Sequence, residues 1–225
     1  MGDQKVVSLV QALDRKYGKV ERPVPVPPPT SADASAVAAV SAKNAQIIAG
    51  VVMGLHGAPA EGAEAAKKLM AHFVDWNEVR VSRPPVLVSV LGRQPRAAER
   101  IALLQRFLEA YFLRQRSLNL DFLYSFKAHE AKRFLSELEV FDREELAAVY
   151  LTGFGVPVFP PSDALRDLAE EIGLLKPKTT TLQMAKKFET ALNLETIYSL
   201  YSHLYSLAND PEGQKAFLKR HNGKK

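Results

Sequence analysis

Residues 134–149 read FLSELEVFDREELAAV, two stretches with helical spacing of apolar residues on either side of a short acidic turn. This spacing predicts one helix over 128–138 and another over 143–151. Glu139, Phe141 and Asp142 fill the turn. Asp142 followed three residues later by Glu145 is typical of a capping box, in which side chains satisfy free N–H groups at a helix start. The stretch therefore predicts two helices joined by a tight turn.

The rest of the chain shows the same pattern of short helices separated by turns. Strand signals are nearly absent, and no repeat with a period of about 20 to 50 residues occurs. We therefore predict an all-α fold, a bundle of short helices. Asp75 is expected to cap one of them. Further helices are expected over residues 6–17, 47–55, 61–73, 76–81, 95–113, 118–124, 162–172, 182–192, 195–207 and 211–220.

The predicted organisation has four parts. Residues 1–21 form an N-terminal helix, 22–43 a Pro/Ala-rich linker, 44–175 the helical core, and 176–225 basic C-terminal helices that complete a second helical lobe. Prolines in 22–29 exclude a helix there, so this stretch is either a stiff connector or a ligand for a polyproline-binding domain. Residues 31–41 are small and polar, which suggests a flexible continuation.

Composition limits the classes of protein and of site. The 225 residues contain no cysteine, which excludes disulfides, thiolate metal sites and cysteine-held iron–sulfur clusters. The five histidines show no metal-ligand spacing, and no cofactor is expected. No uninterrupted apolar stretch of about eighteen residues and no signal-peptide layout occur, so we expect a cytoplasmic protein without membrane contact.

The basic charge lies at the C-terminal end. Residues 176–225 contain nine Lys/Arg against four Asp/Glu, which equals the net charge of +5 of the whole chain. Such a segment either binds polyanions or only keeps the chain soluble. The long helix expected over 95–113 adds an arginine face. Its apolar positions point inward, and four arginines are expected toward solvent, namely Arg93, Arg96, Arg100 and Arg106.

Three segments, taken in order, resemble the endonuclease III branch of the helix-hairpin-helix DNA glycosylases. Residues 69–82 are similar to a helix, break and helix of that family. Residues 134–149 occupy the place of its hairpin, and 155–175 resemble the stretch around its catalytic aspartate. The resemblance covers residues 44–175 and implies a helix-hairpin-helix glycosylase-like fold, with DNA repair by base excision as the associated function.

The resemblance also shows which catalytic groups differ. Family members bind a DNA phosphate through a glycine-rich hairpin, whereas this turn is acidic. Glu144 stands at the position of the lysine nucleophile and Ser162 at that of the aspartate. A carboxylate cannot form a Schiff base, so lyase chemistry is expected to be lost. The neighbouring Asp163 is the candidate for remaining acid chemistry, or else a charge at a helix N-terminus.

Two other features of the family can be sought in this sequence. The residue that fills the space of an extruded base would fall in His56-Gly57-Ala58-Pro59, where His56 either intercalates or lies in a turn. The C-terminal ligands of the family's metal cluster are absent.

Two hypotheses follow. The first is a divergent repair-type protein that docks on double-stranded DNA, with doubtful glycosylase activity. The second is a non-catalytic helical scaffold whose acidic hairpin region meets a protein partner. Under the first, the expected phosphate contacts are Arg93, Arg96, Lys176, Lys178, Lys186 and Lys187.

Overall fold

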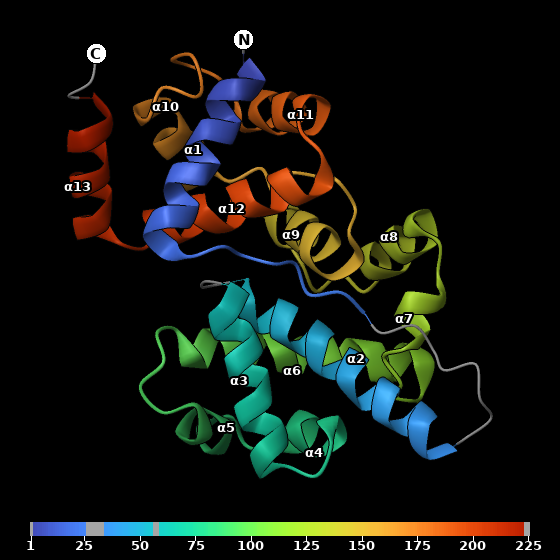
Figure 1. Ribbon diagram of the computed structural model, residues 1–225. Helices are drawn as coiled ribbons and strands as arrows, with labels where there is room; N and C mark the ends of the chain where they lie inside the picture. Colours follow the sequence, from blue (N-terminus) through green and yellow to red (C-terminus); the bar gives the residue numbers. More distant parts are fainter. Residues whose placement is uncertain (1, 26–33, 56–58, 223–225) are drawn as a thin grey trace. The chain divides into compact units, whose positions relative to one another are not determined.

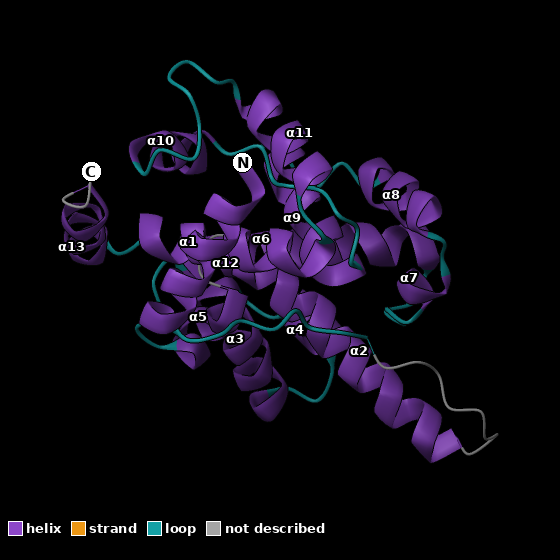
Figure 2. Cartoon of the chain, turned by 45° about the horizontal axis from the view of Figure 1, so that its top comes forward, coloured by secondary structure: helices purple, strands orange, loops and turns teal. Residues whose placement is uncertain are grey.

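The computed structural model describes residues 2–25, 34–55 and 59–222. All regular secondary structure in these residues is α-helical, as Figure 2 shows. The prediction of an all-α fold is therefore confirmed. Most of the Pro-rich arm and residues 56–58 lie outside the described residues, so the interpretations of both segments stay predictions.

The chain divides into two compact units, which are described separately. Unit 1 consists of both chain ends, Met1–Arg22 and Arg143–Lys225, and unit 2 of Pro23–Asp142. In Figure 1, unit 1 contains α1 (Gly2–Tyr17), α9 (Arg143–Phe154), α10 (Asp163–Glu171), α11 (Thr181–Ala191), α12 (Leu194–Ala208) and α13 (Pro211–Asn222). Unit 2 contains α2 (Ala34–Gly54), α3 (Pro59–His72), α4 (Trp76–Val81), α5 (Pro84–Leu91), α6 (Ala97–Gln115), α7 (Phe122–Ser125) and α8 (Ala128–Glu137).

Two helices differ from the sequence expectation. Helix α2 begins at Ala34, so residues 34–43 are helical rather than part of a flexible linker. Its start is rich in alanine, the residue with the highest helix propensity. No element is predicted over residues 84–91, yet α5 lies there. Its Pro84 occupies the first helical position, where a missing N–H leaves no hydrogen bond unmade.

Helices α2, α3 and α6 form the core of unit 2. Glycines at the crossing of α2 and α3 bring the two backbones close together: a Cβ added to Gly50 would lie 3.1 Å from the Cα of Ala63. Helix α6 contributes the largest apolar face. Its predicted inward residues are all fully buried, which confirms the periodicity: Ile101, Leu104, Phe107, Leu108 and Tyr111.

Helix α2 is also the one helix among the described residues with the length and apolarity to cross a membrane. Its buried residues all lie between Asn44 and Gly54, where it packs against α3 and α6. Burial of this half against neighbouring helices is typical of a core helix.

Helix α4 has the predicted N-terminal cap. The side chain of Asp75 accepts a hydrogen bond of 2.8 Å from the backbone N–H of Glu78.

In unit 1, α1 lies alongside α12 (Figure 1). Four apolar residues of α1 at helical spacing are buried: Val6, Leu9, Val10 and Leu13. On α12, Tyr198 and Tyr201 are buried as well, so both belong to the core of unit 1. Tyr201 contacts the ring of Phe159 edge-on, with ring centroids 6.3 Å apart.

Polar contacts connect α1 to the end of α12 and to α13. The buried His203 Nε2 lies 2.6 Å from Asp14 Oδ1. The hydroxyl of Tyr17 donates to Asp210 Oδ2 at 3.1 Å, and Lys16 Nζ lies 4.0 Å from the same oxygen. The Asp210 carboxylate also caps α13, because it accepts the backbone N–H of Gly213 at 2.9 Å.

These contacts lower the pKa of Asp210 below its ordinary value of 3.8, first through the N–H of Gly213 and then through Tyr17 and Lys16. A carboxyl with a lowered pKa in the folded state stabilises that state fully above the unfolded pKa, and this contribution is lost as pH falls through the folded pKa. We expect Asp210→Asn to destabilise the protein at about pH 6, and the difference from wild type to shrink toward about pH 3. Urea unfolding at several pH values measures it, and a pH-independent difference would contradict this assignment.

Candidate functional site

The candidate catalytic residue Asp163 is the first residue of α10. Its side chain is 79% exposed, and its Oδ1 lies 2.8 Å from Nη1 of Arg166. Asp167 and Asp163 together raise the pKa of Arg166, and the main cause is the hydrogen bond that Arg166 donates to Asp167. Catalytic carboxylates are usually set in a cleft that perturbs their pKa. The exposed position agrees with the other interpretation, a negative charge at a helix N-terminus.

Two further residues stand at positions that the resemblance assigns to catalysis. Ser162, at the position of the catalytic aspartate, is the N-cap of α10 and is buried, with its backbone N–H bonded to Pro160 O at 2.9 Å. Glu144, at the position of the lysine nucleophile, lies in the first turn of α9. Neither residue type can act as an amine nucleophile.

Four of the expected DNA contacts lie around the connection from α10 to α11. We call Lys176, Lys178, Lys186 and Lys187 the α11 lysine surface. Lys187 has a structural contact, because its Nζ donates to the carbonyl of Leu174 at 2.7 Å. This bond satisfies a carbonyl just after the end of α10. Lysine side chains often donate to carbonyls at helix C-termini.

The turn that carries Lys176 and Lys178 is held by Thr179 and Thr180. The hydroxyl of Thr179 donates to Lys176 O at 2.6 Å, and its backbone N–H donates to Glu170 Oε1 at 3.0 Å. Thr180 then caps α11 in a reciprocal box with Gln183. The backbone under both lysines is therefore fixed at both ends by hydrogen bonds.

Carboxylates near this surface have partners of their own, whereas three of its lysines do not. Glu189 accepts the backbone N–H of Phe159 at 2.9 Å, and Glu171 accepts from the side-chain amide of Gln214 at 3.0 Å. The exposed Lys176, Lys178 and Lys186 form no ion pair within the described part of the chain. Their positive charge is thus available to an anion.

The other two expected contacts belong to unit 2 and lie in the connection between α5 and α6. Arg93 is exposed and has no ion pair with any described residue. Arg96 is the N-cap of α6, and its Nε donates to Glu99 Oε2 at 2.6 Å. Arg93 therefore keeps a free charge, while Glu99 partly neutralises Arg96.

The expectation that Arg100 points toward solvent is wrong. Its side chain is fully buried and forms an ion pair with Glu61 at the start of α3. Arg100 lies four residues before Leu104, on the inward face of α6, so helical spacing already places it inside. Arg106, on the other hand, is exposed as expected.

The acidic turn of residues 139–142 lies where the two units divide. Glu139 has a φ of 53°, in the left-handed region, without being a glycine. The ring of Phe141 packs against Phe107 of α6 with centroids 5.7 Å apart, and Glu137 at the end of α8 pairs with Arg114. Phe141 of the turn is thus used for packing in unit 2, and Arg114 neutralises the carboxylate of Glu137 just before the turn.

Within the residues that the structure describes, no group of three or more His, Asp or Glu side chains could hold a metal ion. No protein-family model matches the chain. No curated protein matches it either.

A solved structure does resemble the fold. The chain is similar to the one described as a trapped endonuclease III–DNA covalent intermediate in an estranged-adenine complex. The TM-score is 0.55 at 11% sequence identity, over 90% of this chain and 84% of that one. This likeness shows an endonuclease III-like all-α fold and confirms the predicted fold class.

Proposed function

We propose that this protein is a divergent endonuclease III-like protein that docks on double-stranded DNA, as in base-excision repair, without lyase chemistry. The observation that carries the proposal is the α11 lysine surface on this fold. Lys176 and Lys178 are exposed on a hydrogen-bonded turn and form no ion pair with any residue that the structure describes. Lysines contact DNA phosphates regardless of sequence and release counterions when they do so. We propose Arg93 and Arg96 as further phosphate contacts.

The backbone at two of these residues supports a functional role. Lys178 has a φ of 68° and Arg96 a φ of 55°, both in the left-handed region that disfavours residues with a Cβ by about 1 kcal/mol. Glycine would fit these positions without that strain. A long cation at a strained position is typical of a site where a particular side chain is needed.

We expect the double variant Lys176→Glu/Lys178→Glu to weaken duplex binding about tenfold or more. It should also reduce the slope of log affinity against log salt by about one for each lysine lost. Fluorescence anisotropy of a labelled duplex measures both quantities. Lys178→Gly should weaken binding less while it relieves the backbone strain, so the fold is kept. The matched control is Arg15→Glu/Lys19→Glu, which reverses two exposed cations elsewhere in unit 1. Equal losses in variant and control would contradict the proposal.

We further expect no covalent adduct when the protein is treated with borohydride in the presence of an abasic-site duplex. Glu144 offers no amine for a Schiff base at the position that the resemblance assigns to the nucleophile. Gel electrophoresis under denaturing conditions would reveal any cross-linked band. A trapped band would show that a lysine elsewhere in the chain supplies the nucleophile and that lyase chemistry persists.

A non-catalytic scaffold that binds a protein partner through the acidic hairpin region is the second candidate. The turn itself favours this candidate. Glu139 and Asp142 are negatively charged and would repel a phosphate, which the glycine amides of the family hairpin would bind. In that case the duplex should not bind even at low salt. Glycosylase activity through Asp163 and a cytoplasmic location remain predictions, the first testable by base excision with Asp163→Asn.

A further inference from the structure

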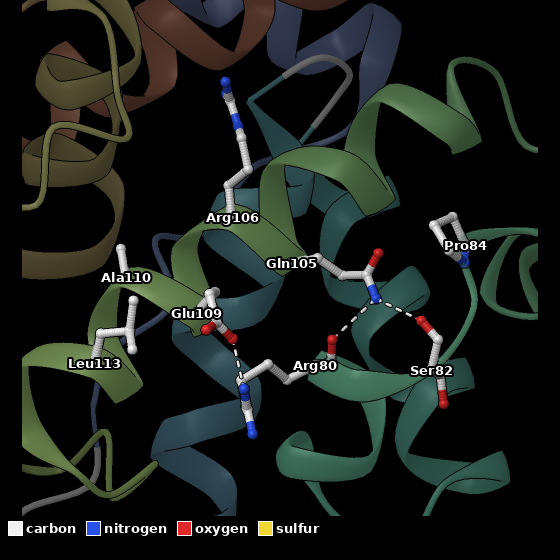
Figure 3. Close-up of a pocket in the computed structure, with 8 residues that line it drawn as sticks. All are labelled: Arg80, Ser82, Pro84, Gln105, Arg106, Glu109, Ala110 and Leu113. Atoms are coloured by element: carbon white, nitrogen blue, oxygen red, sulfur yellow. Dashed lines mark hydrogen bonds and ion pairs between the residues drawn. The ribbon is translucent and has the colours of Figure 1, made fainter.

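A second surface, in unit 2, has a different chemistry from the lysine surface. A hollow of about 490 Å³ lies between α6 and the connection of α4 to α5 (Figure 3). We call it the α6 groove. Its lining includes Arg80 and Pro84 on one side and Arg106, Glu109, Ala110 and Leu113 on the other. From Arg106 to Leu113 they lie on one face of α6, and the small side chain of Ala110 leaves room between the larger ones.

The wall of this groove is held by hydrogen bonds. Gln105 extends from α6, and its Nε2 donates to the carbonyls of Arg80 and Ser82 at 3.2 and 2.8 Å (Figure 3). It also donates to the carbonyl of Val79 at 3.1 Å. These carbonyls lie at the end of α4, where a helix leaves carbonyls unpaired. The groove is therefore preformed, because one side chain connects α6 to the α4–α5 connection.

Exposed apolar side chains lie in the groove and next to its lining residues in the sequence. Leu113, which lines the groove, is 54% exposed, and Val81, between the lining residues Arg80 and Ser82, is 63% exposed. Large apolar side chains gathered at a hollow mark an interaction site more often than bare surface. A DNA backbone would gain nothing from them, whereas a protein segment would.

The charge of the groove is positive. Arg80 is neutralised by Glu109, with Nη1 and Oε2 2.5 Å apart, and its guanidinium lies 4.2 Å from the centroid of the Phe112 ring. Arg106 reaches only the carbonyl of Val140, at 3.5 Å. The exposed Arg83 lies at the N-cap position of α5, between the lining residues Ser82 and Pro84, and has no ion pair with a described residue. Two arginines are thus left for negative charge from outside.

We infer that the α6 groove binds a short acidic segment of a protein partner. A leucine, isoleucine or phenylalanine of that segment seats against Ala110, Pro84 and Leu113. Its flanking carboxylates meet Arg106 and Arg83, where they form charge-assisted hydrogen bonds. An interface of this size is weak and transient, as for other short-segment interactions.

The test uses the dye-labelled peptide Asp-Asp-Leu-Glu-Glu-Leu-Phe-Asp-Asp with the isotope-labelled full chain. We expect saturable binding, with NMR shift changes confined to α4, α5 and α6. Leu113→Asp and Arg106→Glu should each weaken it about tenfold or more. Controls in the same unit are Val37→Asp on α2 and Lys67→Glu on α3, which match the loss of an exposed apolar and of a basic side chain.

Three results would overturn this inference. One is the absence of saturable binding, and another is equal affinity for a peptide with lysine in place of every carboxylate. The third is displacement of the peptide by a single-stranded oligonucleotide at the same resonances, which would assign the groove to nucleic acid. The test does not depend on the lysine surface, since none of its variants alters unit 1.

Discussion

Gly62→Ala is expected to lower the free energy of unfolding by about 3 kcal/mol or more, the largest effect that we predict for a single methyl group. A Cβ at Gly62 would lie 2.6 Å from the Cα of Gly54 and would overlap the carbonyl oxygen of Gly50 and the nitrogen of Gly54. All three are backbone atoms of α2, so no side chain can move to relieve the overlap. Helices α2 and α3 would have to separate.

The control for this variant is Gly18→Ala after the end of α1. Gly18 has a φ of 83° and no atoms within 4 Å of an added Cβ, so alanine there meets only backbone strain of about 1–2 kcal/mol. Chemical denaturation of the two variants and the wild type gives the comparison. Equal destabilisation would show that α2 and α3 do not cross at this close distance.

Glu61→Gln is expected to destabilise the protein by about 2 kcal/mol, because it leaves the guanidinium of Arg100 buried without its counter-charge. The value is below that for a fully buried pair, since the side chain of Glu61 is 45% exposed. Two further nitrogens of Arg100, Nε and Nη1, are buried and have no hydrogen-bond partner in the described part of the chain. Arg100 therefore depends on Glu61.

Removal of the arginine should be milder than removal of its partner. Arg100→Met keeps an apolar chain of similar length inside α6 and also removes the buried donors, so we expect a loss of less than about 1 kcal/mol. Thermal and urea unfolding of both variants would test this order. If Arg100→Met lowers the free energy of unfolding more than Glu61→Gln does, the attraction within the ion pair exceeds the cost of burying its charges.

The predictable parts of the fold are those set by local sequence. The cap at Asp75 and the apolar stripes of α1 and α6 follow from spacing and side-chain chemistry within a few residues, and the structure confirms them. Helix α5 was not predictable in this way. Its first two residues are prolines and valines alternate after them, which favours extended structure, and burial of Leu87 and Leu91 against its neighbours decides otherwise.

The candidate site was predictable in kind but not in detail. The exposure of Lys176 and Lys178 follows from their place in a polar turn. The bond from Lys187 to Leu174 could not be foreseen, because the carbonyl that it reaches belongs to another turn. The burial of Arg100 could have been found from its spacing to Leu104 and Phe107, although its partner on α3 could not. The α6 groove depends on how Gln105 connects two separate helices.

The central claim is that this endonuclease III-like fold still docks on DNA. The most direct measurement is fluorescence anisotropy of a duplex with an abasic-site analogue, compared with the undamaged duplex, at about 50 mM and 200 mM salt. Our account predicts tighter binding to the lesion, and affinity that falls steeply between the two salt concentrations. No binding to either duplex at the lower concentration would contradict it and leave a helical interaction protein with only the fold of the DNA glycosylases.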